Sequence, residues 1–273
     1  MTGPGWAGVA LGAAAGASAA WGHFEAGWVR LRTLDVGLPG LAAELAGLRI
    51  AHLSDFHLGL PSRGERASER AVEWVEDLNA DLVLITGDLV SRPRGEPLLR
   101  ALLQRLGPSY AVLGNHDVEN TRDPFSRTVG LDDLTPARLL VDDAETVELR
   151  GRRVQIVGVD PRAYRRRRSE PWRLIDETAD LRILLCHFPY VLDLLPPGAF
   201  DLVLAGHMHD GQINLPLGRG RKFRFAHPST RYAAGLYERA GATMHVSPGL
   251  GTTFVPFRFF ARPEATELVL KRT

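Results

Sequence analysis

Six short apolar runs, each ending at a polar residue or a glycine turn, constrain the fold of this chain most. They begin after residue 47 and alternate with amphipathic or polar stretches. A short apolar run bounded by turn residues is typical of a strand that is buried on both faces. The runs are LRIAHLSD (48–55), DLVLITGD (81–88), SYAVLGNHD (109–117), RVQIVGVD (153–160), LRILLCH (181–187) and DLVLAGH (201–207).

Two helices are expected between the first three of these strands, because apolar residues there repeat on one helical face. The first half of the chain therefore reads βαβαβ, and strands joined by helical crossovers pair in parallel. In open α/β sheets, ligands gather beyond the carboxyl ends of such strands. The apolar faces consist of Ala67, Ala71, Trp74, Val75 and Leu78, and of Leu98, Leu99, Leu102, Leu103 and Leu106.

The C-terminal third has a different pattern. Residues 231–249 (RYAAGLYERAGATMHVSPG) predict a hairpin around 238–241, and residues 264–272 (EATELVLKR) predict a last strand with rough alternation. No internal repeat or low-complexity linker divides the chain after its N-terminal segment. We therefore expect a single domain over residues 30–273.

Charge and cysteine content exclude several kinds of partner and site. Lysine and arginine number 33 against 32 aspartate and glutamate, so no overall field draws the chain to nucleic acid and none is expected as a partner. The local exception is RAYRRRR (162–168), read either as a solvated loop or as a contact for phosphate or lipid headgroups. The single cysteine, Cys186, excludes an internal disulfide and a multi-cysteine metal cage, and is expected in the core.

Residues 1–29 form an apolar N-terminal segment whose role has more than one interpretation. The stretch 6–22 is uncharged and rich in alanine and glycine, and no lysine or arginine precedes Arg30. A secretory signal would carry a basic residue near Met1, and a spanning helix would be more strongly apolar. The alternatives are a weak membrane anchor and a frayed or packed helix. With an anchor, Arg30 and Arg32 would keep the domain at the cytoplasmic face; a cytoplasmic location and, less favoured, export are the other options.

Polar clusters stand at the ends of five of the expected strands. We expect them to converge on one edge of the sheet, with Asp55 and His57, and likewise His207 and His209, on one side because alternate strand residues share a face. Carboxylate, imidazole and amide oxygen suit manganese, iron or zinc and would not suit copper(I). The clusters are SDFH (54–57), TGDL (86–89), GNHD (114–117), CHF (186–188) and GHMH (206–209).

Two divalent ions about 3.5–4 Å apart would need a shared ligand, and the carboxylate of Asp88 is the natural bridge. Gly87, Gly114 and Gly206 each precede a candidate ligand and leave room for a tight turn. Each cluster alone is a weak signal, because asparagine, aspartate and glycine are also typical of turns and helix N-caps. Together the clusters favour a metal centre.

The five clusters, in this order, resemble the calcineurin-like metallophosphoesterase superfamily, whose pattern is D-x-H, G-D, G-N-H-D/E, H and G-H-x-H. The continuations GHMHDGQINLP (206–216) and SPGLGTTFVPFRFFARPE (247–264) are similar to its bacterial YkuE/YaeI-like branch of small, often membrane-linked phosphodiesterases. One departure is Asp210, where that branch has glycine. The resemblance implies a four-layer α/β/β/α sandwich with mixed sheets.

The resemblance also implies roles for the clustered residues. Asp88 would bridge two divalent ions (Mn²⁺, Fe²⁺ or Zn²⁺), and His116 would donate a proton to the leaving group while Asp117 orients it. His52, His227 and His245 lack motif neighbours and are expected to be packing or surface residues. The remaining ligands would be Asp55, His57 and His209 for one ion and Asn115, His187 and His207 for the other.

The expected activity is hydrolysis of phosphodiester or pyrophosphate bonds by metal-bound hydroxide. An amphiphilic substrate such as UDP-2,3-diacylglucosamine, met at a membrane surface, is one interpretation; the aromatic run FVPFRFF (254–260) would then be core, lid or lipid contact. The alternatives are a soluble phosphoesterase with a small substrate and a non-catalytic scaffold with the same fold. A scaffold usually lacks some ligands, whereas none is missing here. The native metals, the physiological substrate and the oligomeric state stay open.

Overall fold

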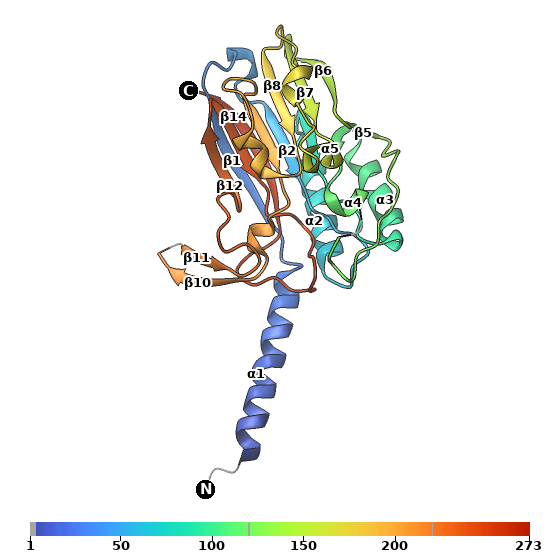
Figure 1. Ribbon diagram of the computed structural model, residues 1–273, viewed down its shortest axis with the longest axis vertical. Helices are drawn as coiled ribbons and strands as arrows, with labels where there is room; N and C mark the ends of the chain where they lie inside the picture. Colours follow the sequence, from blue (N-terminus) through green and yellow to red (C-terminus); the bar gives the residue numbers. More distant parts are fainter. Residues whose placement is uncertain (1–3, 120, 220) are drawn as a thin grey trace.

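The computed structural model describes residues 4–119, 121–219 and 221–273 of the chain (Figure 1). The α-helices are α1 (Pro4–Glu25), α2 (Gly64–Asp77), α3 (Glu96–Leu106), α4 (Asn115–Val118) and α5 (Pro161–Arg165). The strands are β1 (Arg30–Leu38), β2 (Arg49–Leu53), β3 (Leu82–Thr86), β4 (Ser109–Val112), β5 (Ala137–Leu139), β6 (Asp143–Leu149), β7 (Arg152–Gly158), β8 (Leu181–Leu185), β9 (Leu202–Ala205), β10 (Asn214–Gly218), β11 (Arg221–Arg224), β12 (Gly235–Arg239), β13 (Ala242–Val246) and β14 (Glu264–Arg272).

Two mixed six-stranded sheets form the centre of the domain. The first has the order β1-β14-β2-β3-β4-β5 and the second has the order β12-β13-β9-β8-β7-β6. Strands β2, β3 and β4 pair in parallel through the crossovers α2 and α3, which confirms the expected βαβαβ unit. The expected hairpin and last strand are also present as β12–β13 and β14, and the latter pairs antiparallel with β2.

The two sheets stack face to face and share one apolar core. Ile50 and Leu84 of the first sheet belong to the same buried cluster as Ile156, Ile183 and Leu204 of the second. Helices α2 and α3 cover the outer face of the first sheet, where buried Val72 and Leu99 join its core. The outer face of the second sheet is covered by α5 and two 3-10 helices, Pro171–Leu174 and Pro189–Asp193. The four-layer α/β/β/α sandwich is therefore confirmed, with a thin fourth layer.

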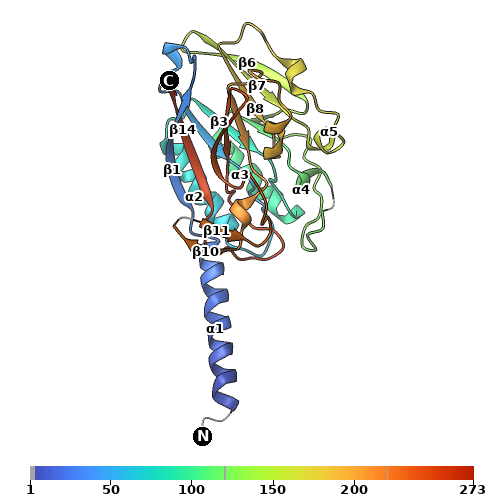
Figure 2. The same ribbon diagram turned by 60° about the vertical axis from the view of Figure 1, so that its left-hand side comes forward.

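Strand directions show at which end of the domain the carboxyl ends of the central strands lie. Strand β1 starts just after α1 and runs parallel to β14, whereas β14 runs antiparallel to β2. The carboxyl ends of β2, β3 and β4 consequently lie at the end of the domain where α1 joins it. In both views α1 extends away from this end, and the hairpin β10–β11 lies beside its base (Figures 1 and 2).

Helix α1 contacts the domain through its last turn. Residues 8–21 are exposed, while Gly22, Glu25 and Ala26 are buried. The carbonyl of Gly22 accepts a hydrogen bond from the Arg258 amide at 3.0 Å, and Glu25 Oε1 accepts one from the Ala261 amide at 2.8 Å. Within the described part of the chain, no helix is long and apolar enough to cross a membrane. Residues 1–29 were interpreted either as a packed helix or as a weak membrane anchor. Packing against the domain is seen for the last turn of α1 alone, and the anchor stays a prediction.

Candidate metal centre

The five polar clusters come together at the end of the domain that α1 joins. The expectation that they lie along the edge of a single sheet is wrong in one respect: β2, β3 and β4 belong to the first sheet, but β8 and β9 belong to the second. The site therefore spans the carboxyl edges of both sheets. Asp55 and His57 follow β2, Asp88 follows β3, Asn115 begins α4, His187 follows β8, and His207 and His209 follow β9.

A left-handed backbone conformation, and not alternation along a strand, sets the direction of most of these side chains. Asp55, His57, Asp88, His207 and His209 all lie past the ends of their strands and have φ angles of 51°, 46°, 53°, 72° and 50°. This left-handed region is uncommon for residues other than glycine, and such strain gathers at functional sites. The expected reason for the pairing of Asp55 with His57, and of His207 with His209, is therefore wrong, although each pair does meet at the site.

Two glycines are required by close packing around the carboxylates. A Cβ atom at Gly114 would overlap Asp88 Oδ1, and a Cβ atom at Gly206 would overlap Asp55 Oδ2. A larger residue at either position would push a candidate ligand out of place. The sequence prediction that these glycines make room at the site is confirmed in this sense.

One group of ligand atoms is formed by Asp55, His57 and His209. His57 Nε2 lies 3.1 Å from His209 Nε2, and Asp55 Oδ1 lies 3.3 Å from His209 Nε2. All three side chains are buried. Ligand nitrogens about 2.1 Å from one ion lie roughly 3.0–3.4 Å from each other, so these separations fit a shared coordination sphere.

The second group is formed by Asp88, His187, His207 and Asn115. His187 Nε2 lies 3.1 Å from His207 Nδ1 and 3.3 Å from Asp88 Oδ2. Asn115 Oδ1 is buried and has no hydrogen-bond partner, as expected of an oxygen whose partner is a cation. The residues present therefore fit a second ion as well as the first.

Ring orientation supports the same interpretation. His187 Nδ1 lies 2.8 Å from the Thr86 carbonyl oxygen, which can only accept, so Nδ1 donates its proton. Once the ring has lost the proton on Nε2, that nitrogen presents a lone pair to the site. His57 Nδ1 lies 2.8 Å from Ser91 Oγ, and this contact holds the ring in place, although a hydroxyl can either donate or accept and so does not fix the tautomer. Ser91 was not singled out from the sequence, because nothing distinguishes a serine after GDL from an ordinary turn residue.

Two carboxylates, Asp55 and Asp88, dominate the electrostatics among the ligand side chains. The pKa values of Asp55 and Asp88 are held below their usual range: burial opposes this, but the neighbouring imidazoles outweigh it. Burial by itself lowers the pKa of His187, but the Asp88 carboxylate outweighs burial and raises that pKa to about 9. His207, which is governed by burial, has its pKa lowered to about 3. The ionised carboxylates of Asp55 and Asp88, with imidazoles around them, form a site that can bind cations.

His116 lies at the edge of the ligand cluster. Its ring stands 4.8 Å from the His57 ring, and its Nδ1 lies 3.1 Å from Ser126 Oγ and 3.3 Å from Thr121 Oγ1. Both contacts involve Nδ1, which leaves Nε2 for another partner.

Asp117 does not contact the His116 ring in the way that was expected. Its Oδ1 accepts hydrogen bonds from the Leu89 and Val90 amides, and its Oδ2 accepts one from the Gly114 amide, at 2.8–3.1 Å. A buried carboxylate satisfies backbone donors in preference to a side chain that already has two hydroxyl partners. Asp117 therefore fixes the loops that carry Asp88 and His116, and acts on the imidazole only through the backbone.

Two further residues beside the site had no sequence signal. Arg258 is fully buried, and its Nη2 lies 3.2 Å from His209 Nδ1. Its guanidinium also donates to the carbonyls of Pro248, Gly249, Gly251 and Ala261. Half-buried His227 has its ring 6.4 Å from that of His207. An arginine within a phenylalanine run and a histidine in a loop resemble surface residues, and only the fold brings them here.

Comparison with known proteins agrees with this geometry. A family model described as calcineurin-like phosphoesterase matches residues 48–211, which carry all five clusters. The chain belongs to the calcineurin-like phosphoesterases. Members of this family are metal-dependent phosphoric ester hydrolases that use two divalent ions. The Asp and His groups described above can hold two such ions.

Several relatives of this calcineurin-like phosphoesterase are known by name. It is 34% identical to a zebrafish (Danio rerio) "transmembrane protein with metallophosphoesterase domain" over 88% of this chain, and spans 57% of that protein's length. It is 29% identical to the metallophosphoesterase YkoQ of Bacillus subtilis over 87% of this chain and 89% of YkoQ. It is 26% identical to the UDP-2,3-diacylglucosamine pyrophosphatase LpxG of Chlamydia muridarum, over 89% of each chain.

Among solved structures, the Haemophilus influenzae NAD nucleotidase matches 75% of this chain and 45% of that chain. The sequence identity is 17% and the TM-score is 0.46. At that score the likeness supports no conclusion about activity.

Proposed function

We propose that this calcineurin-like phosphoesterase hydrolyses a phosphodiester or pyrophosphate bond in an amphiphilic substrate at a membrane surface. Asp55, His57 and His209 would hold one ion, Asn115, His187 and His207 the other, and Asp88 both. When bound, two such ions supply positive charge that polarises the phosphoryl group and activates water. Manganese, iron(II) and zinc all suit this donor set.

The observation that carries the proposal is the cavity beside the ligands. It has a volume of about 560 Å³, within the range of small-molecule sites. Asp88, His116 and His209 are among its polar lining residues, and a group of apolar residues that we call its apolar wall also lines it. A purely polar substrate would leave that wall unused, whereas an acyl or other apolar group would bury it. The apolar wall includes Met208, Ile213, Phe225, Phe254 and Val255.

A second hollow beside the ligands has two arginines in its lining. It measures about 470 Å³ and is lined by Arg122 and Arg165 together with Asn115 and His207. Arg165 forms an ion pair with Glu119. Arg122, the other arginine that lines this hollow, is not part of that ion pair. A guanidinium beside the ligand cluster suits the anionic oxygens of a second phosphate or of a nucleotide. This arrangement favours a diester or pyrophosphate over a simple monoester.

Position within the molecule supports a substrate that comes from a membrane. The ligand cluster lies at the end from which α1 extends, and exposed Leu215, Leu217, Phe225 and Phe254 lie on the hairpin and loop at that end. LpxG is named for a lipid-linked nucleotide, and the zebrafish relative is named as a transmembrane protein. The alternative is a small soluble substrate. A non-catalytic scaffold is disfavoured because the ligand set is complete.

Direct competition tests the proposal. A UDP-linked diacyl sugar, a simple diester and a monoester would compete in detergent micelles with manganese, iron(II) or zinc added. Phe225→Ser/Phe254→Ser should lower kcat/KM for the lipid substrate roughly 10–100-fold and leave the soluble diester within about twofold. A fully buried aromatic contributes about 1.5–3 kcal/mol, and because both rings are about half exposed, a lipid that covers them would gain about 1.5–3 kcal/mol from the pair.

The matched control is Leu215→Ser/Leu217→Ser, which removes two exposed apolar groups of the hairpin β10–β11 that do not line the cavity. Equal losses in the two variants would mean that general surface hydrophobicity, and not the cavity wall, binds the lipid. Preference for the monoester would overturn the amphiphilic substrate.

A further inference from the structure

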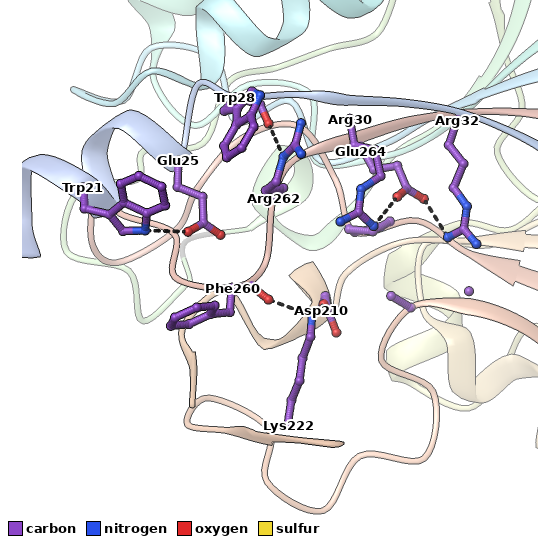
Figure 3. Close-up of a pocket in the computed structure, with 13 residues that line it drawn as sticks. Trp21, Glu25, Trp28, Arg30, Arg32, Asp210, Lys222, Phe260, Arg262 and Glu264 are labelled. Atoms are coloured by element: carbon purple, nitrogen blue, oxygen red, sulfur yellow. Dashed lines mark hydrogen bonds and ion pairs between the residues drawn. The ribbon is translucent and has the colours of Figure 1, made fainter. Parts of the chain in front are cut away.

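A separate cavity lies at the base of α1, and none of the candidate metal ligands lines it. Its volume is about 500 Å³ (Figure 3). Four parts of the chain that are distant in sequence meet around it: the end of α1 with the start of β1, the loop before β14 with the start of that strand, the hairpin β10–β11 with Asp210 before it, and the start of β12. The lining side chains drawn and labelled in Figure 3 are Trp21, Glu25, Trp28, Arg30, Arg32, Asp210, Lys222, Phe260, Arg262 and Glu264.

One wall of this cavity holds three guanidinium groups and one carboxylate. Arg30 and Arg32 are two residues apart on β1, so they share a face, and both approach Glu264: Arg30 Nη1 at 3.4 Å and Arg32 Nη1 at 3.9 Å. Arg262 lies 3.7 Å from the centre of the Trp28 ring and donates to the carbonyls of Trp28 and Val29. Within the described ranges it forms no ion pair.

The lining of the whole cavity has four cationic groups against the carboxylates of Glu25, Asp210 and Glu264, so one positive charge is left over. Glu264 is buried, whereas Arg30 and Arg32 are about half exposed and reach into the cavity. The pKa of Arg262 is lowered, first by burial and then by the charge of Arg30, and the carboxylates of Glu25 and Glu264 only partly oppose this. An anion between the guanidinium groups would relieve the repulsion between Arg30 and Arg262, and phosphate matches the planar fork of arginine.

The opposite wall adds an ammonium group and explains the unusual Asp210. Lys222 Nζ donates to Asp210 Oδ2 and to the Phe260 carbonyl, both at 2.6 Å, and Arg224 also pairs with Asp210. Asp210 has a φ of 49°, a conformation that glycine adopts more easily. An aspartate here holds Lys222 against the rim of the cavity, which glycine would not do.

Aromatic side chains that line the same cavity indicate that the anion belongs to an amphiphile. Trp21, Trp28 and Phe260 line the cavity and are 47%, 44% and 50% exposed. Tryptophan rings are typical of the boundary between headgroups and acyl chains. Beyond Trp21, α1 continues away from the domain with no charged residue between Pro4 and Trp21. The cavity thus has cations on one side and an apolar, outward-directed helix on the other.

We propose that this cavity binds the phosphate ester group of an anionic lipid, at a site distinct from the metal centre. Arg30, Arg32 and Arg262 contact the phosphate oxygens, Lys222 contacts the outer edge of the headgroup, and Trp21 and Trp28 lie beside the start of the acyl chains. Such a site holds the domain with its catalytic end toward the bilayer and requires no turnover.

The test measures binding of the full chain to vesicles of phosphatidylcholine with and without about 30% phosphatidylglycerol. Arg30→Gln/Arg32→Gln should weaken binding to the anionic vesicles at least tenfold. The matched control is Arg150→Gln/Arg152→Gln. It removes two arginines with the same spacing, each ion-paired, from the β6–β7 turn at the opposite end of the domain, and should change binding less than twofold.

A charge-conserving variant separates a built site from general attraction to the surface. Arg30→Lys/Arg32→Lys keeps both charges but loses the forked donors, so a phosphate site predicts clear loss of binding and general attraction predicts none. A lysine variant that binds as the wild type does, or a glutamine variant no weaker than its control, would overturn the proposal. Thermal melting and metal content of each variant show whether it is folded.

Water-soluble glycerol phosphate distinguishes the two possible sources of the anion. If it shifts the fluorescence of Trp21 and Trp28 at the same concentration of phosphate as the vesicles do, the site binds free phosphate esters and the lipid part of the proposal fails. A response to vesicles alone, lost in Trp28→Leu, supports the lipid headgroup.

Discussion

The backbone amide of His116 donates a 2.8 Å hydrogen bond to Asp88 Oδ1. The other oxygen of the same carboxylate, Oδ2, lies 3.4 Å from His57 Nε2 and 3.3 Å from His187 Nε2. Asp88 therefore faces both groups of ligands with one oxygen and holds the loop of the expected proton donor with the other. Of the two oxygens, Oδ2 alone lies near a histidine of each group.

Asp88→Ala should lose both metal ions, because its carboxylate is the one candidate ligand that lies between the two groups. His57→Ala should lose one ion and retain more of the other, since His57 contacts the Asp55 side of the site. Elemental analysis of purified protein measures both. Asp88→Asn serves as the control for folding, because its amide oxygen can still accept the His116 amide hydrogen. Two metal ions per chain in Asp88→Ala would contradict the bridging role.

His116→Ala should keep its metals and slow hydrolysis by roughly 10²–10⁴-fold, as expected for a lost general acid. The size of the defect should depend on the leaving group. A nitrophenolate needs little protonation and should show a small defect, whereas an alkoxide should show a large one. Steady-state rates on a paired series of diesters give the comparison, with metal content measured in parallel. The same defect for both leaving groups would argue against proton donation.

Arg258→Leu should destabilise the domain and weaken the Asp55 side of the metal centre. The fully buried guanidinium satisfies backbone carbonyls of the 248–261 loop and touches His209, so leucine would leave buried acceptors without donors. Such a loss costs about 3 kcal/mol of unfolding free energy. Urea denaturation of the metal-free protein measures this directly. Arg239→Leu, on the exposed strand β12, is the control and should change stability by less than about 0.5 kcal/mol.

Apolar periodicity predicted most of the sandwich but not all of its strands. The six buried strands were predictable because buried strands need continuous apolar runs. Strand β1 was not, because its first residues are exposed and read RLRTLD, and its pairing with β14 is a contact between the two ends of the chain. The hairpin β10–β11 is largely exposed and lacks an apolar run, so it also had no signal.

The candidate ligands were predictable as a set, but their geometry was not. Motif order named Asp55 through His209, yet the left-handed backbone at these residues cannot be derived from alternation along a strand. Asp117 was assigned to the wrong kind of partner, because a carboxylate next to a histidine suggests a side-chain pair when backbone donors are not visible. Arg258 depends on a long-range contact with the end of α1, which no local pattern reports.

Deletion of residues 1–20 should lower the share of protein in the membrane fraction, and should leave hydrolysis of a soluble diester within about twofold of the full chain. Every candidate ligand lies at or beyond Asp55, and the contacts of α1 with the domain begin near Gly22. Deletion of residues 1–29 should behave differently. It also removes the Gly22 carbonyl and the Glu25 carboxylate, which hold the amides of Arg258 and Ala261.

The longer deletion should therefore lower thermal stability and weaken metal binding at His209, whereas the shorter one should do neither. Fractionation, melting temperature and metal content of the two truncated proteins separate anchoring from packing. Unchanged fractionation after removal of residues 1–20 would count against the anchor. Equal stability of both truncated proteins would show that the last turn of α1 does not support the 248–261 loop, and the link from α1 through Arg258 to the metal centre would then fail.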